Sequence, residues 1–141
     1  MMTEQQKKLP QQQKTEQARA TAAWSGIDEI ENSYSSEKKK YGTLARKLPA
    51  MIQSNGLGQT LAFLRAKGGK KSKDAHNLIA DHLGHWVKNQ LKTNHDQDLL
   101  TWIIQQPSDD YRRATTESIA FAIWLRRFAE AKDWGETGGD L

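Results

Sequence analysis

Basic side chains gather in one segment of this 141-residue chain, and their charge is suited to binding phosphate. Residues 37–73 contain ten Lys or Arg residues and one Glu, a balance of +9, although the whole chain has a net charge of only +4. The remainder of the chain therefore carries −5. Where no amphipathic membrane anchor accompanies such a patch, nucleic acid is the commoner partner. A lysine-rich surface that contacts only water is the alternative.

Lysines on a loop have no fixed geometry for reading base edges, so we expect them to contact phosphates. Two arginines of the last predicted helix share one polar stripe and extend the same path if that helix packs beside residues 57–67. The predicted nucleic-acid contacts are Arg46, Lys47, Arg65, Lys67, Lys70, Lys71, Lys73, Arg113 and Arg127.

Residues suited to catalysis or metal binding are sparse. The chain has no cysteine, which excludes disulfides and thiolate ligands and fits a reducing cytosol. The run 68–72, GGKKS, lacks the first glycine and the preceding strand of a phosphate-binding loop. His82 and His85 have a spacing that places them on one helix face, but no HExxH pattern accompanies them. We expect no catalytic residues, no metal and no cofactor.

A stretch at the centre of the chain must position the basic residues. Leu57, Leu61 and Leu64 form one helical stripe, while alanines and Phe63 fill much of the other side. A helix that is apolar on nearly all sides is a buried helix, so we expect that here. The preceding run 54–56, Ser-Asn-Gly, predicts a sharp corner between two helices.

The helical period continues along most of the chain and predicts an all-α fold, a compact bundle of five to six helices in a single domain. The bundle is expected over 13–134, between a disordered polar arm at 1–12 and a flexible tail at 135–141. The expected helices cover 13–31, the segment after Ser36, 57–67, the segment capped by Ser72, 98–106 behind Asp96, and Ser108 to before Gly135. Pro49 is expected to kink or split the second helix.

The polar N-terminus does not resemble a signal peptide, and no apolar run has the length that a bilayer requires. These features predict a soluble, cytoplasmic protein that has neither a membrane partner nor a small-molecule substrate.

Two blocks of sequence resemble a known family. The run Ala50 to Leu64, AMIQSNGLGQTLAFL, closely resembles a motif of the small all-helical subunit of the type III-B CRISPR effector, the Cmr complex (RAMP module). The block Ala114 to Ala131 resembles the C-terminal helix of that family, which ends in a similar Trp-Leu-Arg-Arg-Phe-Ala run. The two blocks occur in the order that the family has.

The resemblance implies a non-catalytic subunit in antiviral defence, because the nuclease and cyclase activities of the Cmr complex belong to other subunits. It also implies that copies stack along a ribonucleoprotein filament and line the channel for the guide RNA and the target RNA. The implied partners are the backbone and large Cmr subunits, copies of the chain itself and both RNAs. A freestanding helical nucleic-acid-binding protein is the first alternative, and a helical enzyme with a metal at the histidines is the second.

Three residues are predicted to contact other subunits: Gln59, Ile123 and Trp124. Gln59 projects from a surface of small side chains where another backbone can approach closely. Ile123 and Trp124 add apolar surface beyond the core stripe of the last helix. The alternative is that all three complete the core of their own monomer.

Overall fold

The computed structural model describes residues 10–93 and 96–136, and within these ranges it contains helices and no strand. The all-α prediction is therefore confirmed. In chain order the elements are α2 (Gln11–Ser33), the 3-10 turn η1 (Ser35–Glu37), α3 (Lys38–Asn55), α4 (Leu57–Gly68), α5 (Ala75–Gln90), α6 (Leu99–Ile103) and α7 (Ser108–Ala131). Most of the predicted arm at 1–12 and of the tail at 135–141 lies outside the described ranges.

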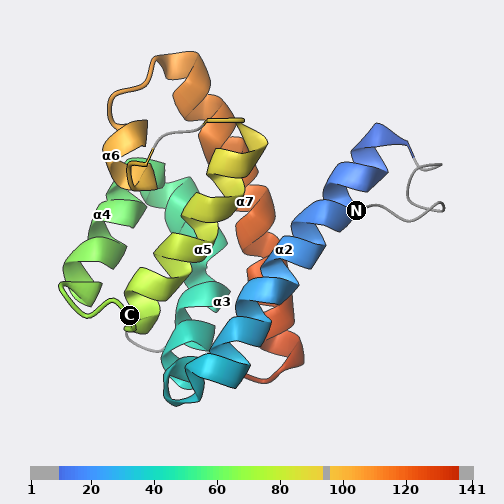
Figure 1. Ribbon diagram of the computed structural model, residues 1–141, viewed down its shortest axis with the longest axis vertical. Coiled ribbons are helices and arrows are strands. Elements are labelled where there is room, and N and C mark those ends of the chain that lie inside the picture. Colours follow the sequence, from blue (N-terminus) through green and yellow to red (C-terminus); the bar gives the residue numbers. More distant parts are fainter. Residues whose placement is uncertain (1–9, 94–95, 137–141) are drawn as a thin grey trace.

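The helices form one bundle around α3. Figure 1 shows α5 across the front with α3 and α7 behind it, while α2 runs along one side and α4 and α6 lie on the other. The most extensive packing joins α3 to α7, and α7 also packs along α2. Segments that are far apart in the sequence therefore build the centre of the molecule.

The core follows the predicted apolar stripes. Helix α3 buries Tyr41, Leu44, Leu48 and Ile52, which lie on one side of the helix. Contrary to one of the two predicted outcomes, Pro49 does not split this helix, which runs for 18 residues through the proline. The two neighbouring stripe residues, Leu48 and Ile52, are both in the core, so burial holds the helix together where Pro49 removes an amide donor.

Helix α4 corrects one expectation. Leu57, Leu61 and Leu64 are buried as predicted, but Ala62 and Ala66 on the other side are exposed. The expectation of a helix buried on nearly all sides was therefore wrong. The reason is its place at the side of the bundle, where it packs mainly against α5 and α3 and leaves its small residues uncovered.

Two predicted helix starts were also wrong. Helix α5 is capped by Asp74, whose side chain accepts the backbone N–H of His76, and not by Ser72. The short helix α6 has Asp98 at its N-cap position in place of Asp96. Asp74 is favoured as a cap because its carboxylate also pairs with Lys40, so that one side chain satisfies two partners.

The segment after α7 is fixed onto α3. A Cβ at Gly42 would lie 2.4 Å from the carbonyl carbon of Trp134, so only glycine allows this approach. Gly135 has a φ of 80° and lies against Thr43, whose hydroxyl accepts the backbone N–H of Glu136 at 3.0 Å. These contacts hold the last described turn of the chain against the central helix.

Substitution of Leu61 or Leu64 by Ala should lower the free energy of unfolding by roughly 2–5 kcal/mol, because each leaves a cavity in the core. Chemical denaturation of the full chain measures this loss. Ala62→Ser, on the exposed side of the same helix, is the control and should unfold like the wild type. Leucine variants that matched the wild type would contradict the stripe assignment.

Candidate nucleic-acid interface

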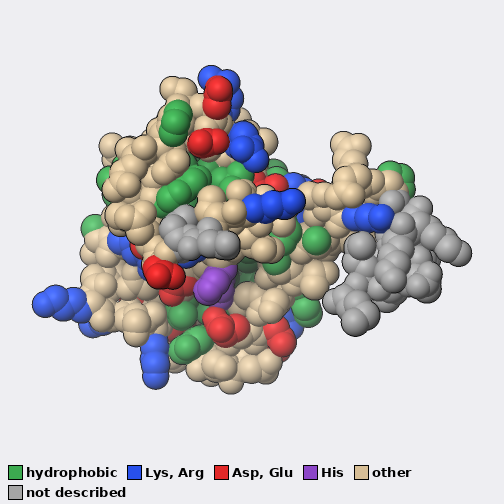
Figure 2. All heavy atoms as spheres, turned by 45° about the horizontal axis from the view of Figure 1, so that its top comes forward, with side chains coloured by type: hydrophobic (Ala, Val, Ile, Leu, Met, Phe, Trp, Pro, Cys, Tyr) green, Lys and Arg blue, Asp and Glu red, His purple; other side chains and the backbone are tan. Residues whose placement is uncertain are grey.

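The basic segment runs from the start of α3 through α4 into the loop 69–74. Folding divides its charges into two groups, according to whether the side chain finds partners inside the bundle. The face drawn in Figure 2 has a histidine bordered by acidic side chains at its centre, with basic side chains around its edge. Basic charge is therefore unevenly distributed over the surface.

Arg65 belongs to the inner group. Its Nη1 donates to the backbone carbonyl of Asn77 at 3.2 Å and to the Asn77 side-chain oxygen at 3.0 Å. Its Nη2 donates to Asp81 at 2.8 Å, and the same guanidinium pairs with Asp98. Burial opposes the charge, but the hydrogen bonds that Arg65 donates to Asp98 and Asp81 outweigh it and raise the pKa of Arg65. Arg65 thus joins α4 to α5 and to the start of α6.

Arg46 also has internal partners. Its Nε donates to the backbone carbonyl of Trp134 at 2.8 Å, and its Nη2 lies 3.9 Å from the carboxylate of Asp133. Lys47, the next residue of α3, is half-buried. The predicted RNA contacts of Arg46 and Arg65 stay predictions, and the structure gives both guanidinium groups a second task in holding the fold.

The outer group consists of exposed lysines at the end of α4 and in the loop after it. Lys70, Lys71 and Lys73 are exposed, and their ammonium groups have no ion-pair partner among residues 10–93 and 96–136. Lys67 is exposed as well, with Nζ 6.0 Å from the centroid of the Phe63 ring. These four ammonium groups are available to an anion from outside.

The backbone of the loop is held although its lysines are exposed. The side-chain amide of Asn77 donates to the carbonyls of Gly69 at 3.2 Å and Lys71 at 3.0 Å. Gly68 fits tightly beneath this amide, since a Cβ there would lie 2.4 Å from the Asn77 nitrogen. The same asparagine accepts from Arg65, so the internal arginine and the exposed lysines are connected through one side chain.

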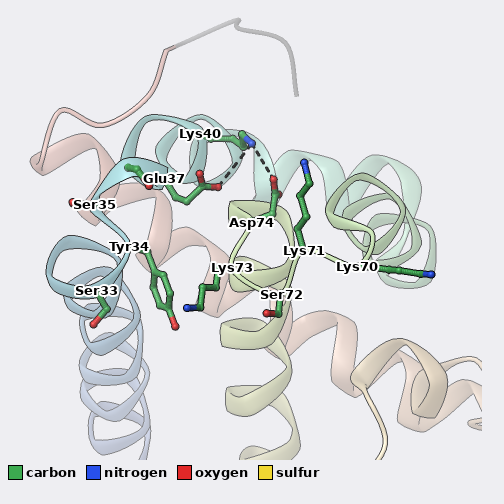
Figure 3. A pocket seen from close by; sticks show the side chains of 11 residues that line it. Ser33, Tyr34, Ser35, Glu37, Lys40, Lys70, Lys71, Ser72, Lys73 and Asp74 are labelled. Carbon is green, nitrogen blue, oxygen red and sulfur yellow. Dashed lines mark hydrogen bonds and ion pairs between the residues drawn. The ribbon is translucent and has the colours of Figure 1, made fainter.

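A groove lies between this loop and the turn from α2 to α3 (Figure 3), and we call it the turn–loop groove. Its volume is about 720 Å³. The lining residues are Ser33, Tyr34, Ser35, Ser36, Glu37, Lys40, Lys70, Lys71, Ser72, Lys73 and Asp74. Hydroxyl and ammonium groups dominate this set, so the groove suits a polar anion better than an apolar ligand.

Lys40 connects the two walls of the groove. Its Nζ lies 3.0 Å from Asp74 and 3.8 Å from Glu37. Burial disfavours the charge on Asp74, but the backbone N–H of His76 and the ammonium of Lys40 outweigh it and lower the Asp74 pKa to about 2. Asp74 is therefore ionised near neutral pH.

The sequence analysis did not predict Lys40, Tyr34 and Asp74 as residues of the groove. The order Asp-Ala-His at the start of α5 was the available signal for Asp74 as the helix cap.

The two predicted arginines of α7 each lie beside an acidic residue of their own helix. Arg113 is exposed and lies 3.5 Å from Asp110, while Arg127 is exposed and lies 3.3 Å from Glu130. Helix α7 packs chiefly along α3 and α2. It also meets the start of α4, where the Tyr111 hydroxyl accepts the backbone N–H of Gly58 at 2.8 Å. That the two arginines extend the basic path of α4 stays a prediction.

The predicted subunit contacts are found in different surroundings. Gln59 is exposed on the uncovered side of α4, and Ile123 is 41% exposed on α7. Trp124 is half-buried; its indole N–H donates to Glu16 of α2 at 2.9 Å, and its ring lies 5.4 Å from that of Phe128. Trp124 therefore contributes to the packing of its own monomer, whereas the other two side chains face outward.

The histidine that invited a metal hypothesis has protein partners. His82 Nδ1 lies 2.7 Å from the hydroxyl of Tyr41, and Nε2 lies 2.8 Å from the carboxylate of Glu29. A neutral ring with its proton on Nε2 satisfies both contacts, since it accepts from the Tyr41 hydroxyl and donates to the Glu29 carboxylate. No group of three or more His, Cys, Asp or Glu side chains with metal-binding geometry occurs among the described residues.

Comparison with known proteins identifies the family. Residues 15–132 match the family described as CRISPR-associated protein (Cas_Cmr5). The chain belongs to the Cmr5 family. A Cmr5 relative from Thermus thermophilus, named CRISPR system Cmr subunit Cmr5, is 33% identical over 93 residues, which cover 65% of this chain and 74% of the relative. Both blocks that carried the resemblance lie inside the matched range, and that resemblance is confirmed.

None of the helices in the described part of this Cmr5 family member combines the length and apolar character of a membrane span.

Acidification should destabilise this Cmr5 family member through His82. Burial of the ring, only partly offset by Glu29, lowers the His82 pKa below 6.5. The unfolded chain therefore binds the proton more readily than the folded chain. The contribution of the neutral His82 ring to the free energy of unfolding is present above pH 6.5 and is lost as the pH falls through the folded-state pKa. The other groups that act on the ring are Tyr41, Asp81 and His85.

Denaturation of His82→Gln between pH 7 and pH 5 should show a flatter dependence of stability on pH than the wild type. His85→Gln is the matched control, since that ring is exposed, and it should keep the wild-type dependence. An unchanged slope in His82→Gln contradicts the assignment.

Proposed function

We propose that this chain is the small, non-catalytic subunit of a cytoplasmic type III-B Cmr effector complex that acts in antiviral defence. The observation that carries the proposal is the match of residues 15–132 to the Cmr5 family, together with the relative whose name makes it a subunit of the CRISPR system Cmr. The subunit stacks with copies of itself, contacts backbone and large Cmr subunits, and lines the channel that holds the guide RNA and the target RNA.

Exposed lysines support the RNA-lining role. Lys67, Lys70, Lys71 and Lys73 lie at one end of α4 and in the adjoining loop, and they form the main phosphate-contacting surface of the proposal. Lys47, Arg113 and Arg127 are further contacts in it. Arg46 and Arg65 remain contacts in the proposal, and their hydrogen-bonding groups hold the fold beneath this surface. Such a surface binds RNA largely without regard to sequence.

Two different apolar surfaces support stacking. One is the uncovered side of α4 with Gln59, Ala62 and Ala66, and the other is the outer side of α7 at Ile123, which is 41% exposed. Helix α4 lies at the left of the bundle in Figure 1, and α7 runs to the right of it, behind α5. When two unlike surfaces of neighbouring copies meet head to tail, each added copy repeats the same contact. If the rotation between copies does not close a ring, the assembly grows as a filament. In the proposal the two surfaces meet in this way.

Gln59→Arg and Ile123→Arg should each reduce incorporation of the subunit, because each places a charge in a contact surface. The measurement is the amount of tagged chain that co-purifies with the other Cmr subunits and the guide RNA. Asn89→Arg, an exposed position on α5, is the control. Full incorporation of both arginine variants, with unchanged thermal stability, would remove these surfaces from the proposal. Failure of the wild type to co-purify would favour a freestanding nucleic-acid-binding protein.

Neutralising Lys70, Lys71 and Lys73 together to Gln should weaken binding alike for unrelated single-stranded RNAs. If each lysine contacts one phosphate, the slope of log affinity against log salt becomes less steep by roughly 2, at about 0.7 per contact. Fluorescence anisotropy at several salt concentrations measures the slope. A variant with Lys14, Lys92 and Arg112 changed to Gln loses the same net charge elsewhere and should keep the slope. An unchanged slope in the loop variant means that these lysines contact only water.

A further inference from the structure

We propose that the turn–loop groove is a binding site for one nucleotide unit, whose phosphate is held by Lys73 beside the hydroxyl groups of the turn. The proposal deepens the RNA-lining function proposed above and rests on it for the RNA strand as the natural source of the nucleotide. A defined site differs from non-specific attraction of RNA by the charge of the basic loop, because it assigns unequal roles to lysines that are neighbours in the sequence.

Charge in the groove favours an anion. Its two carboxylates have internal partners, since Glu37 accepts the backbone N–H of Ala75 at 2.7 Å and Asp74 accepts that of His76 at 2.9 Å. Both also lie close to Lys40, at the distances given above. The negative groups are thus occupied in capping α5 and in pairing with one lysine. The other lysines of the groove retain unpaired positive charge within the described ranges.

The side chains are directed unequally. In Figure 3, Lys73 extends across the groove toward Tyr34, Lys71 projects beside Asp74, and Lys70 extends away from the groove. An anion inside the groove therefore meets Lys73 first. Lys70 has the same charge on the same loop, which makes it a natural reference for the effect of charge alone.

Hydroxyl groups complete the lining. Figure 3 shows Ser33 and Tyr34 on the side of α2 and Ser72 on the loop opposite them. None of these hydroxyl groups has a hydrogen-bond partner within residues 10–93 and 96–136, so they are available to phosphate oxygens and ribose hydroxyls. The Tyr34 side chain also provides an aromatic wall, which suits the sugar and base of a nucleotide.

The walls are held apart by fixed contacts. Lys40 joins the start of α3 to Asp74, and Glu37 joins the same turn to the first amide of α5. Asn77 holds the loop backbone from below. A volume of about 720 Å³ lies within the range of small-ligand sites. The groove is therefore preorganised, and binding does not have to order its walls.

The test compares Lys73→Gln with Lys70→Gln in the full chain, by fluorescence anisotropy with a labelled oligouridine and salt titration. Loss of one charge-assisted hydrogen bond predicts an affinity about tenfold weaker for Lys73→Gln. A clearly smaller loss is expected for Lys70→Gln, whose ammonium contacts phosphate only outside the groove. Tyr34→Phe, which removes only the hydroxyl, should weaken binding about threefold. Thermal melts of each variant check the fold. Equal weakening by the two lysine variants overturns the groove and leaves the RNA-lining proposal intact.

A second measurement distinguishes failure of the groove from failure of the proposed function. Uridine 5′-monophosphate and inorganic phosphate are titrated into the labelled full chain, and amide shifts of residues 71–74 and Ser35 are followed by NMR. Amide shifts that appear with the nucleotide and vanish in Lys73→Gln support the groove as a nucleotide site. If the same chain binds no RNA, the groove stands and the proposed RNA-lining function is contradicted. Equal shifts with inorganic phosphate narrow the ligand to the phosphate and contradict the nucleotide assignment. Absence of shifts with both probes overturns the site.

Discussion

The half-buried guanidinium of Arg65 connects three consecutive helical elements, and the basic end of the molecule depends on it. Its side chain leaves α4, reaches Asn77 and Asp81 of α5, and pairs with Asp98 ahead of α6. Removing such a cation from water is costly, so it requires this number of partners. Asn77 in turn holds the carbonyls of the loop that carries the exposed lysines. An internal charge thus determines where the external charges stand.

Sequence located the basic segment but did not divide it, because the division depends on partners that are distant along the chain. Arg65 and Lys67 are adjacent members of one lysine- and arginine-rich run, yet the first pairs with Asp98 and the second is exposed. Arg46 donates a hydrogen bond to the backbone carbonyl of Trp134, which is 88 residues further along the chain. Residue type predicts that a site is positive, whereas folding decides which of its cations an external ligand can reach.

The helices were predictable to the extent that burial follows a period. The stripe of Leu57, Leu61 and Leu64 is buried because a repeat of this kind has one stable orientation against a core. Ala62 is exposed on the same helix, since periodicity reports which sides are apolar and not how many neighbours cover them. Local capping was misassigned to Ser72 for a similar reason: Asp74 is favoured through Lys40, which lies in a different helix.

The packing of α7 along α3 has a consequence for how the chain is made. The most extensive contact within the described ranges joins residues 38–55 to residues 108–131, so the centre of the bundle depends on residues that are far apart in the sequence. A chain still attached to the ribosome therefore has the buried side of α3 (Tyr41, Leu44, Leu48 and Ile52) without its main partner until α7 has emerged. The bundle closes late in synthesis, and a nascent chain that stops before α7 exposes apolar surface that favours aggregation.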